Sequence, residues 1–153
     1  MKIMEQVLLP PRGVRNNNPL NIRRGSDRWQ GLRTRQSDPL FWQFSSMPWG
    51  LRAAFLVLRS YVSLHGLNTL EQIVWRWAPP RENDTHAYLA YVVSSTGWPA
   101  RSKVPPMRPG ERFWPRLVAA MAKEECGKRV FECRMITMSQ VWCAYRMSLR
   151  PGP

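Results

Sequence analysis

Three absences narrow the classes of protein to which this sequence can belong. The 153 residues contain no run of about 18 apolar residues, so no segment is predicted to span a membrane. The residues before Pro11 lack the long apolar segment and small-residue cleavage site of a signal peptide, so the sequence predicts synthesis in the cytoplasm without export instructions. The three cysteines, Cys126, Cys133 and Cys143, show no metal-ligand spacing. We therefore expect reduced thiols, no disulfide framework, no metal site and no organic cofactor.

Acidic residues are also scarce. The chain has 23 Lys and Arg against 10 Asp and Glu, which gives a formal net charge of +13 at pH 7. Such a surface attracts polyanions, including cell-wall polymers, anionic lipids and nucleic acids, because net charge governs association rather than fold. The excess consists mostly of dispersed arginines, without a basic run, zinc finger or RNA-binding motif, so nucleic acid is the less favoured partner.

The length and composition predict one domain. A chain of 153 residues, 44% of them hydrophobic, suffices for one sizeable core and is short for two domains. We expect residues 1–11 to form a loosely attached leader and residues 12–150 to form the domain, with a proline-rich surface loop at 98–110. Residues 12–24, rich in Asn, Gly and Arg, are predicted to form a loop.

Apolar residues spaced three and four apart predict five helices, so the expected fold class is mainly α. Asn68 and Glu71 resemble a capping box at the start of the second helix, which a pair of prolines ends. Asn83 or Asp84 is expected to cap the third helix, and Gly97 lies just beyond its end. The predicted helices span residues 49–64, 68–78, 83–96, 111–126 and 137–147, and two short segments, 29–33 and 41–44, are predicted to pair as a small β-hairpin.

One glutamate falls on the apolar face of the fourth predicted helix. That face is defined by Trp114, Leu117, Val118 and Met121. At about 100° per residue, Glu125 lies within roughly 30° of the centre of this face. A carboxylate on a core-facing stripe loses hydration, which raises its pKa and lets it donate a proton near neutral pH. Periodicity leaves open the alternative that Glu125 lies at a frayed helix end in water, or pairs with an arginine.

Two stretches resemble known families of cell-wall-cleaving proteins. Residues 117–127, Leu-Val-Ala-Ala-Met-Ala-Lys-Glu-Glu-Cys-Gly, resemble the apolar helix ending in Glu-Ser-Gly that carries the catalytic acid of lytic transglycosylases and goose-type lysozymes. Cys126 stands where that family has Ser or Asn. Residues 12–23, Arg-Gly-Val-Arg-Asn-Asn-Asn-Pro-Leu-Asn-Ile-Arg, are similar to the opening of phage virion lysins of the structural-protein-P5 type. This second resemblance covers about residues 12–127 and continues through residues 29–31, 44–53 and 76–85.

The resemblances imply a lysozyme-like domain that cleaves the β-1,4 bond between N-acetylmuramic acid and N-acetylglucosamine, as a muramidase or a lytic transglycosylase. Glu125 would be the general acid. In flagellar-rod-type glucosaminidases an Asn-rich segment follows the glutamate helix, whereas here residues 17–23 precede it. We therefore infer a circularly permuted version of the fold. The Asn-rich loop would then close over the end of the glutamate helix and bring Asn18 and Asn21 near Glu125.

Several further residues are candidates for the site. Glu82 follows two prolines and is either a rival acid or a second carboxylate, although a carboxylate just before a helix often only complements the helix dipole. If both glutamates act, their separation decides between retention and inversion, whereas lytic transglycosylases need one acid because the sugar's 6-hydroxyl attacks. The predicted substrate-binding residues are Asn17, Asn18, Asn21, Trp29, Gln30 and Trp49, with left-handed turns and core packing as the structural alternatives for the asparagines and tryptophans.

The predicted partner is accordingly the peptidoglycan glycan strand, with further contacts to anionic wall polymers or lipids. The protein would act at the cell wall or in the periplasm, or be carried in a virion. An alternative from a different class is a structural virion protein or nucleic-acid-binding protein that kept the fold and lost activity. Cys126 and the unmatched residues after Gly127 favour this alternative.

Overall fold

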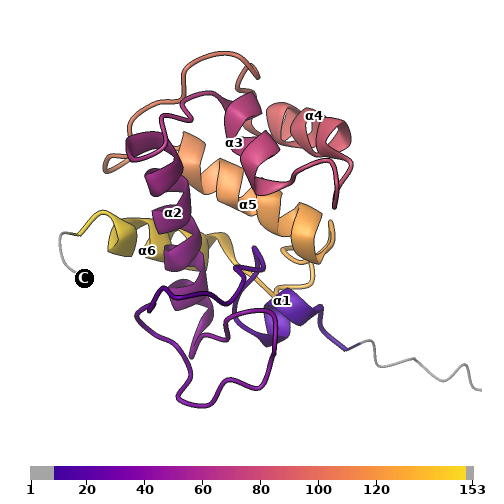
Figure 1. The fold of residues 1–153 in the computed structure, drawn as a ribbon, viewed down its shortest axis with the longest axis vertical. Coiled ribbons are helices and arrows are strands. Elements are labelled where there is room, and N and C mark those ends of the chain that lie inside the picture. Colours follow the sequence, from indigo (N-terminus) through magenta and orange to yellow (C-terminus); the bar gives the residue numbers. More distant parts are fainter. Residues whose placement is uncertain (1–8, 151–153) are drawn as a thin grey trace, which may run out of the picture.

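Helices dominate the structure, a computed structural model that describes residues 9–150 (Figure 1). The mainly α prediction is confirmed, and the five predicted helices are present with ends within two residues of those expected. The predicted leader, residues 1–11, lies mostly outside the described residues. The helices are α1 (Arg12–Arg15), α2 (Met47–Ser63), α3 (Leu70–Trp77), α4 (Thr85–Thr96), α5 (Phe113–Cys126) and α6 (Met138–Ser148). Within residues 9–150, none is long and apolar enough to cross a membrane.

The capping residue of α3 corrects one prediction. The capping box is formed by Thr69 and Gln72, not by Asn68 and Glu71: Gln72 N donates to Thr69 Oγ1 at 3.2 Å, and Thr69 N donates to Gln72 Oε1 at 3.2 Å. Asn68 cannot enter the helix because its carbonyl accepts a hydrogen bond from Val104 N at 2.8 Å in an extended segment. Both residue pairs satisfy the same sequence rule, so only this tertiary contact chooses between them.

The caps predicted for α4 are confirmed. Asp84 is its N-cap, and the Asp84 carboxylate accepts a hydrogen bond from Ala87 N at 3.1 Å. Gly97 ends the helix with a left-handed φ of 67°, a conformation that glycine adopts without steric strain. These local signals therefore fix where α4 begins and where it ends.

The N-terminal lobe, residues 12–46, differs from its prediction in two ways. One helical turn, α1, lies inside the segment predicted as loop, and the two segments of the predicted hairpin pair through an isolated bridge rather than as strands. Isolated antiparallel bridges join Arg23 to Phe41 and Leu32 to Phe44, without a strand among the described residues. Around the Leu32–Phe44 bridge, Arg33 N donates to the Gln43 carbonyl at 2.9 Å and Ser45 N donates to the Gly31 carbonyl at 2.7 Å. Side-chain amides take over nearer the turn: Gln43 N donates to Gln36 Oε1 at 2.7 Å, and Gln36 Nε2 donates to the Gln43 carbonyl at 2.8 Å.

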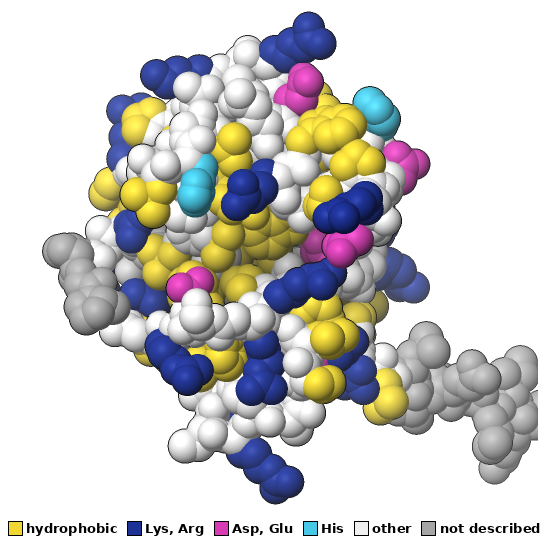
Figure 2. All heavy atoms as spheres, viewed as in Figure 1, with side chains coloured by type: hydrophobic (Ala, Val, Ile, Leu, Met, Phe, Trp, Pro, Cys, Tyr) yellow, Lys and Arg dark blue, Asp and Glu magenta, His cyan; other side chains and the backbone are white. Residues whose placement is uncertain are grey.

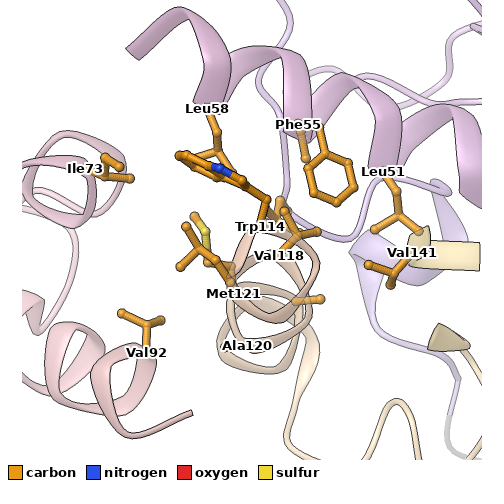
Figure 3. Close-up of a cluster of buried hydrophobic side chains, with 14 of the residues drawn as sticks. Leu51, Phe55, Leu58, Ile73, Val92, Trp114, Val118, Ala120, Met121 and Val141 are labelled. Atoms are coloured by element: carbon orange, nitrogen blue, oxygen red, sulfur yellow. The ribbon is translucent and has the colours of Figure 1, made fainter. Parts of the chain in front are cut away.

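The main hydrophobic core surrounds α5, which runs through the middle of the molecule with α3 and α4 on one side and α6 on the other (Figure 1). Its apolar face meets side chains from α2, α3, α4 and α6 (Figure 3). Because five helices pack on one another here, the end of α5 is held in a fixed position. The labelled core residues are Leu51, Phe55, Leu58, Ile73, Val92, Trp114, Val118, Ala120, Met121 and Val141.

A buried carboxylate organises the N-terminal lobe. Asp38 accepts hydrogen bonds from Arg12 Nε and Arg12 Nη2, both at 2.7 Å, and from Asn16 Nδ2 at 2.9 Å. The backbone N–H groups of Leu40 and Phe41 donate to the same side chain. The Arg12 guanidinium, with these further donors, holds the pKa of Asp38 far below its usual range. This network ties α1 to the loop that precedes α2.

The Asp38→Asn variant is expected to lower Tm by several degrees at pH 7, because the neutral amide cannot pair with Arg12. The folded-state pKa of Asp38 lies below its unfolded value of about 4, so the stabilisation is complete above about pH 4 and declines as the pH falls. Thermal unfolding of both proteins between pH 7 and pH 2 measures the effect. A Tm difference that did not narrow at acid pH would contradict this role.

Candidate active site

Three polar donors from separate parts of the chain converge on Glu125, in the last turn of α5. Trp77 Nε1, at the end of α3, donates to the carboxylate at 3.2 Å, and the hydroxyl of Tyr88 in α4 donates at 3.4 Å. From the N-terminal lobe, Asn21 Nδ2 donates at 3.3 Å. The side chain therefore faces a built polar site and is neither frayed into water nor paired with an arginine.

Burial raises the pKa of Glu125, and the neighbouring charge of Glu124 raises it further. The hydrogen bonds from Trp77, Asn21 and Tyr88 favour the ionised form and oppose the shift, but the net direction is upward. All three donors are neutral, in contrast to the arginine that holds Asp38 ionised. Glu125 therefore keeps its proton to a higher pH than an exposed glutamate does.

Glu125 lines a pocket of about 360 Å³. One wall comes from the N-terminal lobe, and the opposite wall comes from the end of α3 and the turn that follows it. On the face drawn in Figure 2, apolar side chains are visible across the middle, and Lys and Arg side chains are scattered above and below them. The lining residues are Leu20, Asn21, Ile22, Arg23, Phe41, Val57, Tyr61, Trp77, Glu82, Asn83 and Glu125.

The Asn-rich segment positions Asn21 through a fully buried neighbour. Asn18 donates through Nδ2 to the carbonyls of Ile22 at 3.0 Å and Trp42 at 2.9 Å, and its Oδ1 accepts from Ile22 N at 2.9 Å. Asn17 and Asn21 adopt left-handed backbone conformations, with φ of 50° and 53°, which asparagine tolerates better than most residues. The segment is thus folded tightly enough to aim one amide at Glu125.

Cys126 joins the end of α5 to the N-terminal lobe. Its buried thiol donates to the carbonyl of Pro19 at 3.2 Å. The cysteine thus makes a hydrogen bond at the position where Ser or Asn stands in the similar helix of lytic transglycosylases. Burial, with the charge of Glu125, raises the pKa of this thiol to about 12. The thiol therefore stays protonated at neutral pH and is unsuited to nucleophilic catalysis.

The Gly13→Ala variant is expected to lose about 1–3 kcal/mol of stability and most of any activity that depends on Glu125. An added Cβ would lie 2.7 Å from Cys126 Sγ and 3.0 Å from Asn21 Oδ1, so it would push the lobe away from α5. Thermal unfolding and activity assays measure the two effects. Gly25→Ala is the matched control, because its Cβ would meet nothing within 4 Å. Equal behaviour of the two variants would argue against the tight packing at Gly13.

The structure brings three of the predicted site residues together, since Glu125, Glu82 and Asn21 all line the pocket. Among the described residues, the other predicted residues do not line it. Asn17 donates to the Phe44 carbonyl at 3.1 Å, Asn18 is buried as described above, and Gln30 is exposed. Trp29 and Trp49 pack against a second apolar cluster formed by Trp42, Phe44 and Ala53.

Sequence reasoning missed two of the donors, Trp77 and Tyr88. Both side chains pack against the main core, as apolar residues of α3 and α4 do. Their polar tips gave a usable signal, because a buried Trp N–H or Tyr O–H normally finds a hydrogen-bond acceptor. Burial also raises the pKa of Tyr88, so its hydroxyl remains a protonated donor.

The fold and the site together define a small helical protein with a half-buried glutamate that lines a pocket. No family model matches the sequence. The chain is 37% identical over 137 residues to Protein P5 of Pseudoalteromonas phage PM2, an alignment that spans 88% of this chain and 82% of that protein. The chain belongs to the Protein P5 family. The predicted resemblance to P5-type phage proteins is thereby confirmed.

Proposed function

We propose that this chain cleaves the glycan strands of peptidoglycan, using Glu125 as the general acid on a lysozyme-like fold. The observation that carries the proposal is the environment of Glu125. Burial raises the pKa of this carboxyl group, neutral donors hold it, and it lines a pocket. Such a group keeps its proton to a higher pH than an exposed glutamate does, and it can deliver that proton to a bound ether oxygen.

In the proposed reaction, Glu125 protonates the glycosidic oxygen while the bond between that oxygen and the anomeric carbon breaks. The bonding electrons stay with the oxygen, and the sugar acquires oxocarbenium character. Glu125 becomes a carboxylate at this moment, and the donors from Trp77, Asn21 and Tyr88 stabilise the new charge. Either water or the sugar's 6-hydroxyl then attacks the anomeric carbon and gives its proton to the Glu125 carboxylate or, in the hydrolytic version, to that of Glu82, and the product is a reducing or an anhydro sugar.

The contact between the N-terminal lobe and α5 supports the lysozyme-like, circularly permuted version of the fold that the order of the motifs implies. Asn21, which precedes all the long helices, donates to Glu125 at the end of α5. Glu82 lines the same pocket from the other wall, so a role as second carboxylate is part of the hydrolytic version of the proposal.

The charge distribution and the phage relative support a proposed place of action. The N-terminal lobe has seven arginines against two aspartates, which favours adsorption to anionic wall polymers. Figure 2 shows Lys and Arg over the lower part of the drawn face, where Figure 1 places this lobe. Because the relative is a phage protein, carriage in a virion or action on the host wall fits the proposal.

The test is digestion of purified peptidoglycan, with mass measurement of the released fragments. Reducing disaccharides would identify hydrolysis, and a product lighter by one water would identify anhydro-sugar formation. Failure to release fragments at any pH between 4 and 9 would contradict the proposal. In that event, DNA binding that weakens steeply with salt would favour the alternative of a binding protein without activity.

A further inference from the structure

One ion pair crosses the pocket that contains Glu125. Arg23 Nη2, in the N-terminal lobe, lies 3.0 Å from Glu82 Oε2 in the turn between α3 and α4. Both residues line the pocket, on walls that come from segments 59 positions apart in the sequence. Among the described residues that line this pocket, Arg23 is the only cation. The pair therefore places this cation on the wall of the pocket that Glu125 also lines.

This ion pair is poorly explained by stability alone. The side chains of Arg23 and Glu82 are 67% and 54% exposed, and ion pairs with such exposure contribute little because water solvates both partners. Asp38 and Arg12 show what a structural pair looks like in the same lobe: the Asp38 side chain is 7% exposed and carries several further hydrogen bonds. Arg23 can consequently exchange Glu82 for another anionic partner at little cost.

A ligand that fills the pocket would lie between the walls that the pair connects. If the ligand carries a carboxylate, Arg23 can exchange the Glu82 carboxylate for that of the ligand, with no net loss of charge-assisted hydrogen bonds. A neutral ligand offers no such exchange and has to separate the pair without compensation. Glu82 thus competes with the ligand for Arg23. A ligand carboxylate can take its place and a neutral group cannot, so the pocket can distinguish acidic from neutral ligands.

We propose that Arg23 is a specificity-determining residue that binds a carboxylate of the glycan substrate, and that Glu82 occupies its guanidinium when the pocket is empty. The inference rests on the proposed function, because it assigns the substrate class of the same pocket. The recognised group is a carboxylate on the sugar, such as the free lactyl carboxylate of N-acetylmuramic acid in strands without stem peptides, because an attached peptide converts that group to an amide. The backbone bridge between Arg23 and Phe41 fixes the base of the arginine at the pocket wall.

The experiment compares two forms of one ligand: a tetrasaccharide of alternating N-acetylglucosamine and N-acetylmuramic acid, with free lactyl carboxylates or with those groups converted to methyl amides. Binding is measured by calorimetry in the Glu125→Gln background, which prevents turnover. Arg23→Gln, Glu82→Gln and Glu71→Gln are compared in that background. Glu71 is the matched control, because it also pairs with an arginine, Arg101, but does not line the pocket.

The carboxylate form is expected to bind about 10-fold more tightly than the amide form, and Arg23→Gln is expected to remove this preference. Glu82→Gln should strengthen binding of the carboxylate form by a few-fold, because the competitor is gone, and Glu71→Gln should change neither ligand. Retention of the preference in Arg23→Gln would overturn the assignment. An equal effect of Arg23→Gln and Glu82→Gln on the binding of both ligands would also overturn it, because the ion pair would then only hold the two pocket walls together.

Cleavage by the wild-type protein separates this inference from the proposed function. If the wild type digests peptidoglycan and the Arg23→Gln variant keeps the preference, only the role of Arg23 is wrong. If the wild type releases no fragments and neither tetrasaccharide binds, the proposed function fails and the inference fails with it. Thermal unfolding of each variant checks that an exposed substitution leaves the fold intact.

Discussion

The Glu125→Gln variant is expected to cleave peptidoglycan at least about 10²-fold more slowly than the wild type. Glutamine has the size of glutamate but no acidic proton, so it cannot protonate the glycosidic oxygen. Its side-chain oxygen can still accept hydrogen bonds from Trp77 and Tyr88, so the packing at the end of α5 should persist. The measurement is the initial rate of fragment release at several pH values. A variant as active as the wild type would exclude Glu125 as the acid.

Glu124 offers a matched control one position away. Its side chain pairs with Lys128, and its charge contributes to the raised pKa of Glu125. Glu124→Gln is therefore expected to keep activity within a few-fold at the optimum. Because Glu125 must be protonated to act, activity should fall as the pH rises through its pKa, and this fall should move to lower pH in Glu124→Gln. An unchanged profile would show that Glu124 does not influence the acid.

The same Glu125→Gln variant is expected to be more stable than the wild type at neutral pH. The folded-state pKa of Glu125 is raised, so the folded protein loses stability as the pH rises from about 4, where the unfolded glutamate ionises, through the folded-state pKa. Glutamine avoids this loss, so the variant should gain stability at pH 7, and the gain should disappear below about pH 4. Unfolding in urea at both pH values measures the difference in stability between the variant and the wild type. A gain of the same size at acid pH would show that ionisation of Glu125 is not its cause.

The sequence predicts the helices and the inward position of Glu125 because both depend on local spacing. Apolar periodicity places Glu125 on the face of α5 that packs in the core, and cap residues such as Asp84 mark helix ends. The donors from Trp77 and Tyr88 could not be predicted in the same way. They reach Glu125 only because α3 and α4 pack beside α5, an arrangement that no local pattern specifies.

The four asparagines of the N-terminal lobe show the limit of reading residue type alone. Asn16 and Asn18 are buried and bond to the lobe itself, and Asn17 bonds to the Phe44 carbonyl. Only Asn21 faces Glu125. Asparagine suits both sugar binding and loop geometry, so the sequence gives no means of separating these roles, and the separation comes from contacts distant along the chain.

The Gly50→Ala variant is expected to lose about 3 kcal/mol of stability, which lowers Tm by roughly 10 °C, together with any activity that requires Asn21. A Cβ at Gly50 would lie 1.7 Å from the Asn17 carbonyl oxygen and 3.2 Å from the Asn18 Cα. These are backbone atoms, which cannot move aside as the end of a flexible side chain can. The N-terminal lobe would therefore have to separate from α2 and carry Asn21 away from Glu125.

The sign of this effect opposes the intrinsic preference of the helix. Gly50 lies inside α2, where replacement of glycine by alanine normally stabilises a helix by about 1 kcal/mol. A fall in Tm would therefore be a measure of the lobe contact, because helix propensity alone predicts a rise. If Gly50→Ala were as stable as the wild type and equally active, the Asn-rich segment would not pack against α2 as described. The position of Asn21 beside Glu125 depends on that packing.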